Sequence, residues 1–202
     1  MGKKTIILID GQNLYYSLRN LGLREIDINW GNFLKSLIEK GDELIRTYWF
    51  RPEKILDCQL NLAIAKGYIK RKRLDFNPDD FLSKCKDWYN EQLTLFKSQN
   101  YKYDQIQLEY ENIAIMKKGL IKINPWGQYY LGEKGVDVAL SVQMVKMQDK
   151  IDKIILVSGD YDYVEAIKYV KENLKTVHIV RFFKGKPPKT RGMSKELSLY
   201  AD

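Results

Sequence analysis

The chain has 202 residues, of which 45% are hydrophobic and 30% are charged, a composition typical of an ordinary folded domain. Two cysteines and one histidine are too few for a disulfide framework, a zinc cluster or a mechanism that needs paired catalytic histidines. The N-terminal apolar run is too short for a signal peptide, and no run of about 18 apolar residues could cross a membrane, so we expect a cytoplasmic protein. The net charge of +8 is compatible with a polyanionic partner, although basic surfaces also serve solubility alone.

The first elements predict a strand that feeds a helix. Residues 5–9 form a near-continuous apolar run, as expected of a central parallel strand that is covered on both faces. The run ends at Asp10, and apolar residues at helical spacing follow over residues 12–21. A second helix over residues 30–38 and a strand over residues 43–50 come next.

The middle of the chain, at about residues 53–125, is less typical. Apolar residues between 55 and 65 are compatible with a helix, and the helix-start pattern at residues 77–80 predicts a long amphipathic helix to about residue 98. Residues 106–110 alternate between apolar and polar, which predicts a strand. Apolar runs at 113–116 and 120–123 flank a glycine turn, which predicts a hairpin or a bent edge strand.

The last third returns to alternating helices and strands. A helix is predicted from Val136, with Asp137 in its first turn, and a buried strand is predicted over residues 154–157. A turn containing Asp160 links that strand to a helix at residues 163–174, and a last strand covers residues 177–183. This alternation predicts an α/β fold with a mostly parallel sheet, in which the single histidine, His178, is a buried or half-buried strand residue.

Acidic residues stand at the turns of this predicted sheet. Asp10 and Asp160 each follow a buried strand, so both should lie at the carboxyl edge of the sheet, and the helix that carries Asp137 could reach them. Clustered carboxylates repel one another, and a hard divalent cation compensates for that repulsion. The chemistry that follows is metal-assisted hydrolysis of a phosphodiester, which needs no histidine.

Each acid taken singly has a simpler interpretation. Asp is a favoured helix N-cap, so Asp160 or Asp162 alone is more often a cap than a metal ligand. Two polar neighbours, Asn13 and Ser158, fit two roles equally well: holding a water or a metal ion, or making a local backbone hydrogen bond.

Three blocks of sequence resemble the NYN domain, a branch of the PIN-like nucleases. They are Ile-Leu-Ile-Asp10-Gly-Gln-Asn13-Leu, Lys134-Gly135-Val136-Asp137-Val138-Ala-Leu and Leu156-Val157-Ser158-Gly159-Asp160-Tyr-Asp162-Tyr, and they occur in the family's order. The resemblance implies a Rossmann-like, PIN-like three-layer fold in a single domain over residues 1–202, with an inserted helix and β-rich segment. It also implies an Mg²⁺ or Mn²⁺ site and RNA cleavage, with endonucleolytic cleavage favoured.

By position, the resemblance implies catalytic roles for Asp10, Asp137 and Asp160, with Asp162 as a further metal ligand and Asn13 in support. One position departs from the family pattern, since Gln143 stands where family members often carry a second acid. An amide is an uncharged and poorer ligand, so a catalytically silent RNA-binding module is the main alternative.

A second alternative is a phosphatase with an aspartyl nucleophile. Asp160, Asp162 and Val164 match the first motif of the haloacid dehalogenase-like hydrolases. That motif normally opens such a chain, whereas only 38 residues follow Val164 here, so this function is disfavoured.

Basic residues supply candidate contacts to RNA phosphates, for single-stranded or structured RNA. They fall in a run at residues 70–73 and in the last part of the chain, and they are Lys70, Arg71, Lys72, Arg73, Arg181, Lys184, Lys186, Lys189 and Arg191. The run at 70–73 is equally compatible with a solvated helix face.

Tyr15, Tyr161 and Tyr163 lie next to the proposed acids and could stack on unpaired bases. The sequence leaves open the RNA target, and the middle segment could select substrate or support a homo-oligomer.

Overall fold

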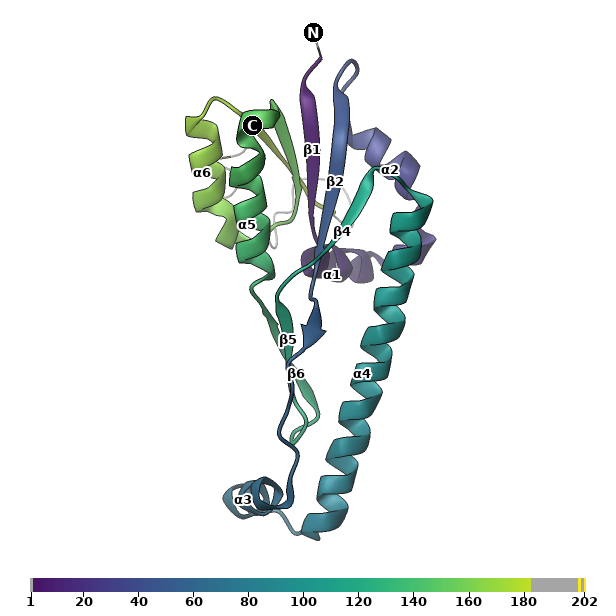
Figure 1. Cartoon of the computed structure of the whole chain (residues 1–202), viewed down its shortest axis with the longest axis vertical. Coiled ribbons are helices and arrows are strands. Elements are labelled where there is room, and N and C mark those ends of the chain that lie inside the picture. The colour runs from purple at the N-terminus through teal and green to yellow at the C-terminus, as the bar shows by residue number, and fades with distance from the viewer. Residues whose placement is uncertain (1, 183–199, 201) are drawn as a thin grey trace. The chain divides into compact units, whose positions relative to one another are not determined.

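The computed structural model describes residues 2–182, 200 and 202 (Figure 1). The chain divides into two compact units, which we describe separately. The first unit consists of residues 1–51, 106–118 and 135–202, and the second of residues 52–105 and 119–134. The middle segment predicted to be atypical overlaps the second unit, and the single-domain organisation stays a prediction.

The first unit is built on a parallel sheet of five strands. In chain order these are β1 (Lys4–Asp10), β2 (Glu43–Arg51), β4 (Ile113–Lys117), β7 (Lys153–Val157) and β8 (Thr176–Val180). Their order across the sheet is β4-β2-β1-β7-β8, so the chain starts in the centre, builds outward through β2 and β4, and resumes on the other side of β1 with β7. The point between β1 and β7, where the direction of strand addition reverses, is where such folds bind ligands.

Helices cover both faces of this sheet, as the period of two along each strand requires. Ile6 and Leu8 of β1 belong to one core cluster, whose helical side comes from α5 (Val136–Met147) and α6 (Val164–Glu172). These two helices contact each other directly (Figure 1).

The opposite face of the sheet carries a second apolar layer. Ile7 and Ile9 alternate with the residues of the first cluster and are fully buried. The helices α1 (Gly11–Leu21) and α2 (Trp30–Leu37) supply further buried residues, and Trp30 packs against Trp49 of β2 with ring centroids 4.5 Å apart. The unit is therefore the predicted three-layer α/β fold.

Three short 3-10 helices join these elements. They are η1 (Glu25–Asp27), η2 (Gln148–Lys150) and η3 (Tyr161–Tyr163). Half-buried His178 lies in β8 as predicted, with Nδ1 3.6 Å from a Glu39 carboxylate oxygen.

The second unit combines helices with a small mixed sheet. Its strands β3 (Lys54–Ile55), β5 (Leu120–Asn124) and β6 (Tyr129–Lys134) are ordered β3-β5-β6, with β5 parallel to β3 and antiparallel to β6. Helix α3 (Leu62–Lys72) begins at an Asn61 cap, whose side chain accepts a hydrogen bond from the amide of Ile64. Helix α4 (Pro78–Glu109) begins at the predicted Asn77 cap and belongs to this unit up to residue 105.

The structure departs from three predictions for the middle segment, although β4 does lie at the edge of its sheet. Residues 106–110 are no strand, because α4 continues to Glu109 and the amide of Tyr110 still bonds the carbonyl of Ile106 at 3.0 Å. The runs at 113–116 and 120–123 do not pair with each other, since β4 joins the parallel sheet while β5 pairs with β3 and β6. The apolar stretch 55–65 contains a short strand at its start, and the helix begins only at Leu62.

Among the described residues, no helix is long and apolar enough to span a bilayer.

A buried ion pair lies at the amino end of the parallel strands, opposite the edge that carries the acids. The ammonium of Lys153, on a side chain only 1% exposed, lies 2.5 Å from an Asp42 oxygen and 2.9 Å from a Glu39 oxygen. The hydrogen bond from Lys153 lowers the pKa of Asp42 and of Glu39. Because these folded-state pKa values are depressed, their contribution to stability is present above the unfolded values and is lost as the pH falls through the folded ones.

We expect Lys153→Met to lower Tm by roughly 5–10 °C at neutral pH, because breaking a buried pair leaves its partner uncompensated. The deficit should shrink as the pH falls below about 4, from the unfolded pKa values toward the depressed folded-state values of Asp42 and Glu39. Thermal unfolding followed by circular dichroism at both pH values measures this. A deficit that is the same at both pH values would show that lost packing, and not the ion pair, is responsible.

Candidate functional site

The carboxylate of Asp10 is the centre of the candidate site. Asp10 is the last residue of β1 and is only 3% exposed. One of its oxygens accepts a hydrogen bond from the amide of Asn13 at 3.0 Å, which caps helix α1. The other accepts from the hydroxyls of Ser158 at 3.0 Å and Tyr163 at 3.1 Å. Burial raises the pKa of Asp10, and these hydrogen bonds act in the opposite direction.

The next residue, Gly11, allows the close approach of β2 that this arrangement needs. A Cβ atom at Gly11 would lie 2.5 Å from the carbonyl oxygen of Phe50 and 2.3 Å from the side chain of Arg51. The Arg51 guanidinium donates to the Gly11 carbonyl at 3.1 Å and pairs with Glu25 at 3.2 Å. A larger residue at position 11 would therefore displace the backbone beside Asp10.

The two polar neighbours predicted to support the site both bind backbone. The side-chain oxygen of Asn13 accepts from the amide of Gly159 at 3.2 Å, which joins α1 to the turn after β7. The hydroxyl oxygen of Ser158 accepts from the amide of Asp160 at 3.1 Å while its proton goes to Asp10. Both residues thus hold the turn after β7 against the end of β1.

The phenol of Tyr163 links the first acid to Asp137. Tyr163 is fully buried, and its hydroxyl lies 3.1 Å from an Asp10 oxygen and 3.1 Å from an Asp137 oxygen. Asp137 comes from the first turn of α5, as predicted. A neutral phenol carries one proton, so it donates to one carboxylate at a time. Burial and the two nearby carboxylates raise the pKa of Tyr163, which keeps the phenol neutral.

Tyr163 is the site residue that sequence reasoning missed. The prediction that it could stack on a base is wrong, because its ring is buried in the core beneath α5 and α6. Tyr15 and Tyr161 are 40% and 50% exposed, so their rings are accessible. The sequence signal that could have identified Tyr163 was its position three residues after Asp160, in an acidic turn. An aromatic residue at helical spacing, however, usually indicates core packing.

Asp160 and Asp162 lie on the turn that follows β7. The Asp160 side chain accepts from the amide of Asp162 at 3.2 Å and so caps η3, while Asp162 itself is exposed. Burial raises the pKa of Asp137, and the negative charges of Asp160 and Asp162 raise it further. The four predicted acids therefore influence one another from three segments of the chain.

The acids do not form a closed metal cage. Among the described residues, no group of three His, Cys, Asp or Glu side chains is close enough to hold a metal ion together. Mg²⁺ does not require such a cage, because it is commonly held by one or two carboxylates together with waters and substrate phosphate. Asp10 and Asp137, which share one hydroxyl, fit that kind of donor set, as does Asp160 on the turn after β7.

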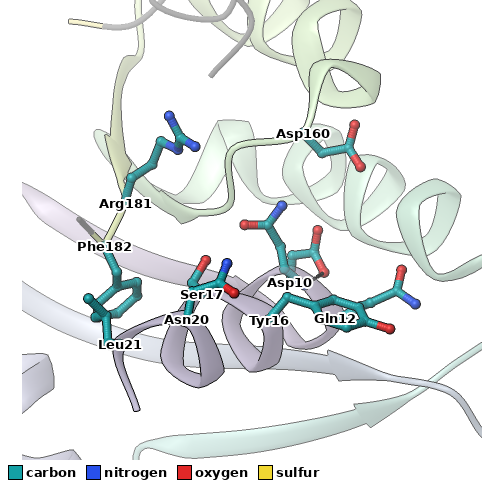
Figure 2. A pocket seen from close by; sticks show the side chains of 10 residues that line it. Asp10, Gln12, Tyr16, Ser17, Asn20, Leu21, Asp160, Arg181 and Phe182 are labelled. Carbon is teal, nitrogen blue, oxygen red and sulfur yellow. Dashed lines mark hydrogen bonds between the residues drawn. The ribbon is translucent and has the colours of Figure 1, made fainter. Parts of the chain in front are cut away.

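A pocket of about 320 Å³ opens beside these acids. Figure 2 shows its lining, which comes from Asp10, from α1, from Asp160 and from the end of β8. Arg181 and Phe182, which follow β8, line the pocket. Phe182 also stacks on Phe33 with ring centroids 5.7 Å apart. A Cβ atom at Gly159 would lie 2.5 Å from the Arg181 guanidinium, so a larger residue there would require this side chain to move.

Arg181 is the predicted phosphate-binding residue that the structure brings to the acids, and burial lowers its pKa. The basic run at residues 70–73 lies on and just after α3 of the second unit, and all four of its side chains are exposed. The remaining predicted contacts lie outside the described residues, and they are Lys184, Lys186, Lys189 and Arg191. Gln143 is half-buried on α5.

Comparisons with known proteins give a family match and one similar fold. The NYN domain model matches residues 4–202, and no curated protein matches the chain. Among solved structures, a protein of unknown function from Vibrio parahaemolyticus is 18% identical, with a TM-score of 0.54 over 100% of this chain and 90% of that one. At this level of identity the likeness concerns the fold alone.

We expect Tyr163→Phe to lower the free energy of unfolding by about 1–3 kcal/mol, because buried Asp10 and half-buried Asp137 lose a shared donor while the ring packing is kept. Urea denaturation at neutral pH measures this. Tyr169→Phe, which removes a hydroxyl from the half-exposed ring of α6, serves as the matched control and should change little. Equal stability of both variants would contradict the bridging role of Tyr163.

Proposed function

Because the chain belongs to the NYN domain family, we propose that it is a metal-dependent ribonuclease whose site is the acidic pocket at the end of β1. The observation that carries the proposal is the meeting of Asp10 and Asp137 at one hydroxyl, beside a pocket that Asp160 shares with Arg181. The pocket therefore offers acceptors for a divalent cation and a guanidinium for a phosphate, and RNA supplies that phosphate.

The four acids and Arg181 each have a role in this proposal, although Asp137 and Asp162 do not line the pocket itself. Asp10 and Asp137 would hold Mg²⁺ or Mn²⁺, Asp160 would contribute directly or through a water, and exposed Asp162 would act through water. When bound, the cation supplies activation of a water and stabilisation of the leaving oxygen. Arg181 binds the phosphate, for which its planar guanidinium is suited.

The remaining residues orient this machinery. Ser158 and Asn13 fix the turn that carries Asp160, and Tyr163 holds Asp10 and Asp137 at a constant separation. Such fixed positions lower the cost of reorganisation when substrate binds. Gln143 adds no charge to the site, so cation binding would depend on these acids and on the phosphate of the RNA.

We expect Asp10→Asn and Asp160→Asn to lower RNA cleavage at least about 100-fold, because each removes a charged ligand from the pocket. The assay follows labelled RNA with Mg²⁺ or Mn²⁺ by gel electrophoresis, and Tm checks that both variants fold. Asp149→Asn, at an exposed acid of η2, is the control and should cleave like the wild type.

Equal cleavage by the wild type and both pocket variants would identify the activity as a contaminant. If the wild type binds RNA but never cleaves it with either cation, the silent RNA-binding module is the correct description.

We also expect Mg²⁺ or Mn²⁺ to raise the Tm of the wild type, because a ligand that binds only the folded state stabilises it. At a concentration 100 times its Kd the cation should add about 2.7 kcal/mol. The shift should disappear in an Asp10→Asn, Asp137→Asn double variant. An unchanged shift in that variant would place cation binding elsewhere.

A further inference from the structure

An aromatic cluster joins three segments of the second unit. The ring of Phe76, which precedes α4, stacks on Phe81 with centroids 5.7 Å apart and planes 8° apart. Phe81 also stacks on Tyr68 of α3 at 5.8 Å and 17°. Trp126, from the turn between β5 and β6, lies 6.1 Å from Phe81 and 6.2 Å from Tyr68, with planes within 28°. Four rings from these three segments therefore share nearly one orientation.

Three of these rings line a cavity of about 350 Å³, and several of its lining residues are exposed to solvent. Phe76, Phe81 and Trp126 supply its apolar lining, and the acids Asp75 and Asp80 are among its polar groups. Phe76 is 52% exposed, so a large apolar ring stands in water at the cavity. The volume of the cavity and its flat aromatic lining suit a ligand that contains a planar ring.

The turn that carries Trp126 is held in place by its own hydrogen bonds. The side-chain oxygen of Asn124 accepts from the amides of Trp126 at 3.1 Å and Gly127 at 3.2 Å, and its amide donates to the Tyr129 hydroxyl at 2.8 Å. A Cβ atom at Gly127 would lie 2.4 Å from the Tyr129 ring. The indole is thus presented by a fixed backbone.

Positive charge lies next to the rings. Helix α3 contains no acid and ends in the exposed run at residues 70–73. Arg71 and Lys72 follow Tyr68 by three and four residues, which places them one turn along the same helix face. The Arg71 guanidinium carbon lies 5.7 Å from the centroid of the Tyr68 ring. Tyr68 therefore links the aromatic cluster to the basic end of α3.

We propose that this cavity binds an unpaired base of RNA, with the adjoining phosphates on the basic end of α3. Stacking on aromatic rings combined with a cationic path for the backbone is how proteins hold single strands. Asp75 and Asp80 repel phosphate and can accept hydrogen bonds from the amino group of a base, which favours the base over the backbone inside the cavity. This inference rests on the proposed function, because it gives the nuclease a separate place to hold its RNA.

The test is the affinity of the full chain for a short labelled oligoadenylate, measured by fluorescence anisotropy with EDTA so that cleavage does not interfere. Phe76→Ala should weaken binding about tenfold, because a stacked base loses one partner. Since Phe76 is exposed, this change should not unfold the unit. Arg71→Gln with Lys72→Gln should also reduce the slope of log Kd against log salt by about 0.7 for each phosphate that the protein no longer neutralises.

Tyr101→Ala is the matched control, because this 66% exposed aromatic lies on α4 of the same unit, about 30 Å along the helix from Phe81. It should bind like the wild type. No binding by the wild type, or equal affinity of the Phe76 and Tyr101 variants, would overturn the proposal.

Trp126→Phe gives a second measurement that does not depend on stability. Oligoadenylate should quench tryptophan fluorescence of the wild type, and this variant should keep the affinity within about threefold while losing most of the quenching. Quenching that persists in the variant would place the base elsewhere. Binding that depends on Phe76, without cleavage in Mg²⁺ or Mn²⁺, would refute the nuclease function and support the base-binding cavity. Cleavage by a protein whose RNA affinity does not depend on Phe76 would support the nuclease function and refute the base-binding cavity.

Discussion

The first unit depends on one buried carboxylate, that of Asp10. Removing a charge from water is costly unless hydrogen bonds replace the lost solvation, and here three protein donors do so. Each donor comes from a different element or turn: Asn13 lies in the first turn of α1, Ser158 follows β7, and Tyr163 ends η3. The charge therefore fixes the positions of segments about 150 residues apart, and the same fixed positions define the pocket.

The strand order explains why the site forms at this point. Because β1 lies in the centre and β7 is added on its other side, the carboxyl ends of β1 and β7 are neighbours in the sheet. The amino ends of the same strands also carry a buried charge, but there Lys153 is neutralised by two acids, Asp42 and Glu39. At the carboxyl ends negative charges gather instead, with pKa values of Asp10 and Asp137 raised by burial. One edge of the sheet is thus electrostatically satisfied, while the other is suited to receive a cation.

The sequence predicted the parallel strands, the central place of β1 and the positions of Asp10 and Asp160 after buried strands, because continuous apolar runs that end in acids have few other structural explanations. It failed where local pattern and tertiary context disagree. Leu108 is 75% exposed, so the alternation around it reflects the solvent side of a continuing helix and not a strand face. The role of Tyr163 depends on a hydroxyl at the end of a buried ring, and hydrophobic periodicity carries no information about where such an atom points.

The two units have different surface chemistry, and this has a functional consequence. In the first unit the pocket combines two acids, Asp10 and Asp160, with the guanidinium of Arg181, so it suits a cation and one phosphate. In the second unit, the stacked aromatic rings and the exposed cations at the end of α3 provide stacking and positive charge for a single strand of RNA. Stacking tolerates any base, whereas cleavage requires a particular phosphate geometry. Affinity for RNA and the rate of cleavage should therefore be set by different residues, and a change in one property need not alter the other.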